Sequence, residues 1–414
     1  MATYKISVKK ISPEQLFMGS VLLVNGGNYL YNLLLGRLLG PEAFADAALL
    51  VTLLLVLSFM GMTFQLTTAK FALLFSGNAW EGFKQYIYRS AVLFGLLIGF
   101  LLMYFAEELQ LLFHTQTSWM FTAFGLGIPI YFVMSVNRGR FQGRQDFGKL
   151  SLTYQTEMWS RLLLTFGLLY MVPMHPVLLV AWGIVLSFLF GLIPCDTRKI
   201  TLRKHHSLAP TDVKRVAKFI VLTACYELTQ IIINNSDVLL VKHYFDALDA
   251  GLYASLALIG RVVYFVAWMF VMLLLPTVVQ KQKDGEPTTP VLFKYVGYIG
   301  LLSTGIVIGC YLFPQLIIEL MFGQAYIAMA DLLWQYALAT SLFAISNIFA
   351  YYFLSLDQYM PVVLSGILGL SQILLVIFFH STLEIVVQVQ IVAMVALLIT
   401  QLLYFTQKMT LPKV

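Results

Sequence analysis

Long apolar segments recur along the chain, and they constrain its fold more than any other feature. Twelve of them are long enough to cross the roughly 30 Å hydrocarbon core of a bilayer. The residues are 60% hydrophobic and 11% charged, against about 25% charged in soluble proteins. The sequence therefore predicts an all-α polytopic membrane protein. The predicted spans are 14–37, 45–69, 86–106, 118–137, 150–171, 176–194, 215–240, 248–278, 291–313, 328–355, 358–379 and 383–406.

The lysines and arginines orient these segments. If the N-terminus lies inside, 22 of the 26 basic residues fall on the inner side, and only Arg37 and Lys242 fall on the outer side. Basic residues concentrate in cytoplasmic loops of membrane proteins. We therefore predict that both termini and the basic segment 195–214 are cytoplasmic. The net charge of +6 follows from this asymmetry, so we expect no nucleic-acid binding.

Few residues suggest chemistry that needs a metal, a cofactor or a catalytic group. The cysteines, Cys195, Cys225 and Cys310, lie far apart and predict neither a disulfide framework nor a metal site. No nucleotide-binding loop is present, so direct use of ATP is not expected. The outer loops are short, which argues against a glycan polymerase or ligase. We expect a protein that is not an enzyme and has no cofactor.

The two halves of the chain resemble each other. A shift of 206 residues places Asn28 on Asn234 and the first two predicted spans on the seventh and eighth. Each half holds six predicted spans, so the halves are parallel repeats. We predict two six-helix bundles, 1–194 and 215–414, joined by the linker 195–214. Repeats of this kind place the substrate between the bundles near mid-membrane.

Two arginines, Arg161 and Arg261, lie near the middle of predicted spans. A charge at that depth costs roughly 2.5 to 3.5 kcal/mol on insertion scales, so it pairs or lines a watery cavity. The guanidinium stays charged and donates in pairs, which suits phosphate. Glu157 lies one turn before Arg161, so a structural ion pair is the alternative for that arginine. Arg261 has no acidic residue within four positions.

A polar stripe follows the predicted span 215–240. Steps of 4, 3, 4 and 3 place its members on one helical face: Thr223, Glu227, Gln230, Asn234 and Asp237. In lipid such a face must meet protein or water. Interhelical hydrogen bonds, the simpler explanation, contribute only about 0.6 to 2 kcal/mol each. We predict a cavity wall, with Glu227 and Asp237 as candidates for coupling to H⁺ or Na⁺.

A basic hairpin follows the fourth predicted span and contains Arg138, Arg140 and Arg144. Basic residues at the inner ends of spans set topology and contact lipid headgroups. The functional hypothesis is that these arginines are the first to capture an anionic headgroup.

Three segments carry a resemblance to a known family: LLGRLLGPEAF (34–44), NNSDVLLVKHYFDALDAGLYASLALIGR (234–261) and LMFGQAYIAMADLL (320–333). Their order, together with the twelve-span plan, resembles polysaccharide flippases of the MOP superfamily, the Wzx type. Ala45 and Ala47 depart from the family pattern, which often has Gly and Tyr there. The resemblance implies a MATE-like fold of two six-helix bundles around a V-shaped cavity.

The resemblance also implies a substrate and a location. An undecaprenyl-pyrophosphate-linked oligosaccharide would move from the inner to the outer leaflet of a bacterial cytoplasmic membrane, for cell-surface polysaccharide biosynthesis. Arg261 and Arg161 could hold the pyrophosphate. Amides and aromatic rings suit sugars, and these candidates are Asn28, Asn234, Gln230, Tyr253 and Tyr264. Membrane lipid, a polysaccharide polymerase and glycosyltransferases are the expected partners.

Two alternatives stay open. A MATE-type multidrug exporter would have the same fold and would use Glu227 and Asp237 for cation coupling. Its cavity would attract organic cations, so the sign of the cavity charge distinguishes it from a flippase. A membrane-embedded glycan-processing enzyme would need paired catalytic groups or a large outer loop.

Overall fold

The computed structural model describes residues 13–194, 208–356, 358 and 360–410. Within these ranges the chain is helical, with short connections and no strand. Most of the predicted linker, residues 195–207, lies outside the description, as does Cys195.

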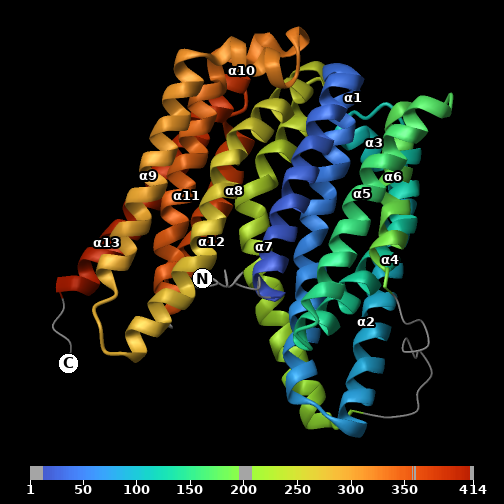
Figure 1. Ribbon diagram of the computed structural model, residues 1–414. Helices are drawn as coiled ribbons and strands as arrows, with labels where there is room; N and C mark the ends of the chain where they lie inside the picture. Colours follow the sequence, from blue (N-terminus) through green and yellow to red (C-terminus); the bar gives the residue numbers. More distant parts are fainter. Residues whose placement is uncertain (1–12, 195–207, 357, 359, 411–414) are drawn as a thin grey trace, which may run out of the picture. The chain divides into compact units, whose positions relative to one another are not determined.

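The helices follow one another along the chain as Figure 1 traces them. Their bounds are α1 Pro13–Leu74, α2 Gly77–Tyr104, α3 Ala106–Phe113, α4 Trp119–Gly143, α5 Phe147–Met171, α6 Pro176–Gly191, α7 Pro210–Tyr244, α8 Ala247–Lys283, α9 Thr289–Leu312, α10 Pro314–Met321, the 3₁₀ helix η2 Gln324–Leu332, α11 Leu333–Ser355, α12 Met360–Phe378 and α13 Leu383–Thr410.

The first two predicted spans both fall on α1, the span 328–355 covers the end of η2 and all of α11, and each of the others falls mainly on one helix. By length and apolarity alone, eight helices of the described ranges qualify as membrane spans, and the bent α7 makes a ninth. The long α1 enters that count once. α6 is short, with 16 residues, and α5 carries Glu157 and Arg161 in its middle. The predicted fold class, an all-α polytopic membrane protein, is confirmed.

A sharp break at Gly40 divides α1 into its two spans. The helix has 62 residues, or about 93 Å at 1.5 Å per residue, far more than one bilayer crossing needs. Gly40 has φ 73° and ψ 172°, a conformation that residues with a side chain avoid. Pro41 follows, and a proline suits the first turn of the next helical segment because no partner for its missing N–H is needed there.

Gly251 of α8 packs against this break. A Cβ atom on Gly251 would lie 1.9 Å from the carbonyl oxygen of Pro41. The backbones therefore approach each other closely, and any larger residue at position 251 would push them apart. Gly251 is the glycine that the C-terminal repeat keeps where the N-terminal repeat has Ala45.

Contacts divide the chain into two compact units. Unit 1 comprises the residues up to Tyr31, together with Leu57–Leu109 and Thr117–Glu227. Unit 2 comprises Asn32–Val56, Gln110–Gln116 and the residues from Leu228 onward. The middle part of α1, residues 32–56, thus belongs with the C-terminal helices. The predicted boundary at 195–214 lies mostly outside the described residues and stays a prediction.

Three polar contacts attach segment 32–56 within unit 2. Arg37 donates to the carbonyl oxygen of Leu320 at 2.7 Å, at the C-terminal end of α10, where a helix favours cations. Tyr326 donates to the carbonyl oxygen of Gly36 at 2.7 Å. Nζ of Lys242 lies 2.8 Å from Oδ1 of Asp46, and both side chains are almost fully buried, at 2% and 0% exposure. Lys242 is one of the two basic residues assigned to the outer side, and this ion pair accounts for its burial.

Candidate functional site

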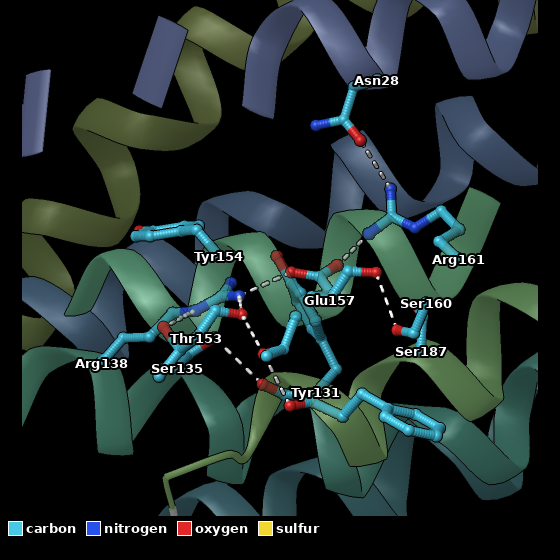
Figure 2. Close-up of polar contacts among 12 residues, drawn as sticks. Asn28, Tyr131, Ser135, Arg138, Thr153, Tyr154, Glu157, Ser160, Arg161 and Ser187 are labelled. Carbon is cyan, nitrogen blue, oxygen red and sulfur yellow. Dashed lines mark hydrogen bonds and ion pairs between the residues drawn. The ribbon is translucent and has the colours of Figure 1, made fainter. Parts of the chain in front are cut away.

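Unit 1 contains a carboxylate held between two arginines. Glu157 lies in the middle of α5 and is 7% exposed. Figure 2 shows Arg138 and Arg161 reaching it from two sides. Nη2 of Arg138, on α4, lies 2.6 Å from Oε2, while Arg161, one turn further along α5, donates to Oε1. The ion pair that the sequence offered as the alternative for Arg161 is therefore present, with a second arginine added.

Besides Glu157, Arg138 has hydrogen-bond partners and an aromatic contact inside unit 1. Its Nε donates to Oγ1 of Thr153 at 3.1 Å, and its Nη2 donates to the carbonyl oxygen of the same residue at 3.0 Å. The guanidinium also lies 3.9 Å from the centroid of the Tyr154 ring. With 5% exposure and these partners, Arg138 is a structural counter-ion for Glu157.

The three arginines of the basic hairpin do not share one exposed surface. Arg140 is 4% exposed and donates to Oδ1 of Asn137 at 2.7 Å. Arg144, in the turn after α4, is exposed. Of the three arginines predicted to capture a headgroup together, Arg138 and Arg140 are therefore buried, and Arg144 alone is accessible.

Arg161 carries the surplus charge of this cluster. Its Nη1 donates weakly to Oδ1 of Asn28 on α1 at 3.4 Å, and its Nε has no hydrogen-bond partner among the described residues. The side chain is 11% exposed, against 6% for that of Arg138. Two guanidinium groups share one carboxylate, so one positive charge is left over. Because Arg138 is the better satisfied of the two, we assign that charge to Arg161.

Unit 2 contains a second buried carboxylate, Asp237 of α7, at 2% exposure. Nη2 of Arg261, on α8, donates to its Oδ1 at 3.2 Å. The hydroxyl groups of Tyr253 and Tyr336 donate to its Oδ2 at 3.1 and 2.7 Å. Gln390 of α13 in turn donates to the Tyr253 hydroxyl. Asp237 thus balances the charge of Arg261, and the cluster is neutral overall.

A small cavity of unit 2 opens beside this network. It measures about 30 Å³, room for roughly one or two water molecules. The cavity brings together four predicted site residues from α7 and α8 with polar residues of α11, α12 and α13. The polar and ionisable lining residues are Asn234, Asp237, Arg261, Tyr264, Tyr336, Thr340, Gln372 and Gln390.

Several of these residues were not singled out in the sequence. Gln372 and Gln390 are isolated amides within predicted apolar spans, a signal that could have identified them. Tyr336 offered no such signal, because a tyrosine in an apolar helix is common. Asp46 was also missed, since its partner Lys242 lies nearly two hundred positions away.

The remaining predicted site residues are distributed between the units. Asn28 lies beside Arg161 in unit 1, and its repeat equivalent Asn234 lines the cavity with Arg261 in unit 2. Glu227, the last residue of unit 1, is half-buried on α7. The side chain of Gln230 lies outside the described part of the chain. Tyr253 is fully buried and donates to Asp237.

Solved structures with this fold are membrane transporters of the MOP superfamily. An inward-facing multidrug resistance MATE family transporter of that superfamily matches with a TM-score of 0.77 at 13% identity, over 93% of this chain and 95% of that one. The lipid II flippase MurJ, in an inward closed conformation, matches with a TM-score of 0.78 at 13% identity, over 94% of this chain and 87% of that one.

A further match is a MOP superfamily transporter from Pyrococcus furiosus, described as having a binding pocket of reverse polarity that suggests a different function. Its TM-score is 0.56 at 12% identity, over 95% of this chain and 94% of that one. Identities this low establish the fold alone. A search of curated proteins finds no match to this chain.

The fold is that of a multi-pass membrane protein, and it is similar to the fold of transporters of the MOP superfamily. Residues 34–331 match the family described as polysaccharide biosynthesis protein, and the chain belongs to that family. The resemblance to polysaccharide flippases of the MOP superfamily is therefore confirmed.

Proposed function

We propose that the protein is a flippase that moves an undecaprenyl-pyrophosphate-linked oligosaccharide from the inner to the outer leaflet, by alternating access, for cell-surface polysaccharide biosynthesis. The observation that carries the proposal is the surplus positive charge on Arg161 in the middle of α5. An uncompensated cation at membrane depth is costly, so it marks a place that an anion occupies during function. Membership in a polysaccharide biosynthesis family supports a glycan as the cargo.

Arg161 has the donors that such a headgroup needs. Its Nε has no partner among the described residues, and its contact with Asn28 is long, at 3.4 Å. Charge-assisted hydrogen bonds from a guanidinium to phosphate oxygens are short and strong. A pyrophosphate would therefore gain two donors from Arg161 while Glu157 keeps Arg138 as its partner.

Arg261 supplies a second cation, but under a different condition. Asp237 already compensates its charge, at 3.2 Å. A pyrophosphate would have to displace Asp237 from Arg261, or Asp237 would have to accept a proton. Binding of pyrophosphate by Arg261 thus depends on whether Asp237 is displaced or protonated. Asp237 is therefore the first candidate for ion coupling, and Glu227 is the second.

The sugar groups would meet amides and rings near the two arginines. Asn28 lies beside Arg161, while Asn234 and Tyr264 line the cavity with Arg261. Gln230 and Tyr253 complete the proposed set, although Tyr253 is fully buried and acts through Asp237 in the described state. We place the protein in the bacterial inner membrane with both termini cytoplasmic, working beside glycosyltransferases and a polysaccharide polymerase.

The charge of the unit 1 cluster weighs against a multidrug exporter of organic cations. Such a cargo would meet a net positive charge at Arg161, where the desolvated interaction is repulsive. The proposed transport needs no catalytic group.

Reconstitution tests the proposal directly. The purified protein is placed in liposomes with a fluorescent polyprenyl-pyrophosphate oligosaccharide, and the cargo that reaches the opposite leaflet is measured with a membrane-impermeant reagent. We expect movement well above that of protein-free liposomes, and a large loss for Arg161→Gln. A matched polyprenyl lipid without phosphate should not be moved. Equal movement of the phosphate-free lipid would refute pyrophosphate recognition, and no movement of either lipid would refute the flippase.

A further inference from the structure

The end of α1 packs into an aromatic platform at one end of unit 1. The ring of Phe71 lies 5.4 Å from that of Phe83 on α2 and 6.0 Å from that of Phe219 on α7, between centroids. Phe83 in turn lies 5.8 Å from Trp80. Phe71 and Phe83 are fully buried, whereas Phe219 is half-buried. Rings from three helices therefore pack into one aromatic platform.

Two exposed cations contact this platform, and each lies over an aromatic ring of the other cation's helix. Nζ of Lys70, on α1, lies 3.9 Å from the ring centroid of Phe219. Cζ of Arg215, on α7, lies 6.0 Å from the ring centroid of Phe71. Each cation thus uses a ring of the other helix. Cation–π contacts of this kind hold the side chains in place while their exposed charges stay available.

The adjoining residues strengthen the positive potential. Arg144 is exposed, and its Cζ lies 5.4 Å from the centroid of a Trp80 ring. The first turns of α7 carry two further exposed lysines, Lys214 and Lys218. A helix N-terminus is already electropositive, so cations at this position are unfavourable until an anion approaches them.

Two of the acidic residues near this platform have lysine partners. Oε2 of Glu81 lies 2.7 Å from Nζ of Lys84, and Oδ2 of Asp146 lies 2.6 Å from Nζ of Lys149. The hydrogen bond from the Lys149 side chain holds the pKa of Asp146 below its ordinary value. These carboxylates therefore neutralise their own lysines. Asp212 lies in the first turn of α7, three positions before Arg215, but the exposed cations outnumber it: Lys70, Arg144, Lys214, Arg215 and Lys218.

We propose that this cation–aromatic platform, defined by Lys70, Phe71, Arg215 and Phe219, binds the headgroup of an anionic phospholipid. The platform lies at the ends of apolar helices, which is where lipid headgroups lie in a membrane. The distribution of lysine and arginine predicts that this end faces the cytoplasm, and anionic lipids of that leaflet attract basic clusters. The phosphate would sit between Lys70 and Arg215, and the site is independent of the glycan cargo.

Lipid binding to the purified full-length protein tests this site. Native mass spectrometry compares phosphatidylglycerol with phosphatidylethanolamine on the wild type and on Lys70→Gln/Arg215→Gln. We expect preferential binding of phosphatidylglycerol and a roughly 20- to 30-fold loss in the double variant, since each basic residue near an anionic surface contributes about fivefold. Lys294→Gln is the matched control, because Lys294 is an exposed lysine 5.8 Å from the Tyr298 ring in unit 2. The phosphatidylglycerol affinity of Lys294→Gln should stay within about twofold of that of the wild type.

A charge-preserving variant separates binding from folding. Lys70→Arg/Arg215→Lys should keep most of the phosphatidylglycerol affinity, whatever the Gln variant does to stability. Three results would overturn the proposal: equal binding of the two lipids by the wild type, unchanged affinity in the Gln variant, or loss of affinity in the charge-preserving one. Full displacement of the lipid by inorganic phosphate would assign the platform to a free anion instead.

Discussion

Arg138 on α4 lies 2.6 Å from Glu157 on α5, and this contact changes what is expected of Arg161. The sequence paired Glu157 with Arg161 because they lie one turn apart. In the structure Glu157 has two cations, so it keeps a partner when Arg161 is removed. A structural role and a binding role for Arg161 therefore predict different outcomes.

Arg161→Gln should leave a folded protein that does not export glycan. The Arg138–Glu157 pair stays neutral in this variant, so the loss of stability should be well below the roughly 3–5 kcal/mol expected when a buried pair is broken. Membrane abundance and thermal melting in detergent measure the folding, and glycan export measures the function. Normal export with normal abundance would remove Arg161 from the binding site.

Glu157→Gln should behave in the opposite way. It leaves two buried guanidinium groups without a carboxylate, and about 3–5 kcal/mol of stability should be lost. The double variant Glu157→Gln/Arg138→Met removes one of these charges and should recover much of the melting temperature. A single Glu157→Gln variant as stable as wild type would contradict the assignment of Glu157 as the shared counter-ion.

Arg261→Ala should abolish export, and it should also destabilise unit 2. Arg261 has no acidic residue within four positions, so the sequence does not indicate this loss of stability, but in the variant Asp237 would remain buried with only tyrosine hydroxyls as partners. Arg261→Ala/Asp237→Asn should restore abundance while export stays absent, which separates the two effects. Arg261→Lys should restore export in part, since a point charge replaces the planar fork. Full export by the double variant would show that Arg261 only neutralises Asp237.

Glu227→Gln tests proton coupling. Glu227 is half-buried on an apolar helix, and a carboxylate in that position is a candidate for carrying the coupled proton. If it does, transport by the variant in liposomes should become slow and independent of an imposed pH gradient. Glu384→Gln, at an exposed acid near the start of α13, is the control and should respond to the gradient like wild type. A wild-type response in Glu227→Gln would exclude Glu227 and leave Asp237, the first candidate, as the coupling residue.

The helices were predictable from the sequence because membrane spans depend on local apolarity. The partners of the buried charges were not predictable from the sequence. Glu157–Arg161 is a contact of one helical turn and was visible, whereas Arg138–Glu157 and Arg261–Asp237 join different helices, 19 and 24 positions apart. Helical periodicity places Asp237 on the polar face of α7, but it does not say which helix that face meets. The burial of Arg138 and Arg140 was not predicted either, because it also depends on which helices pack together.

The attachment of segment 32–56 to unit 2 has a practical consequence for dissecting the protein. Arg37, Gly36 and Asp46 provide partners for Leu320, Tyr326 and Lys242. A C-terminal fragment cut at the linker would lack all three, and Lys242 would be left as a lone buried cation. Co-expressed fragments should therefore reassemble better when the first one carries α1 intact, and neither fragment should be expected to fold as a self-sufficient half.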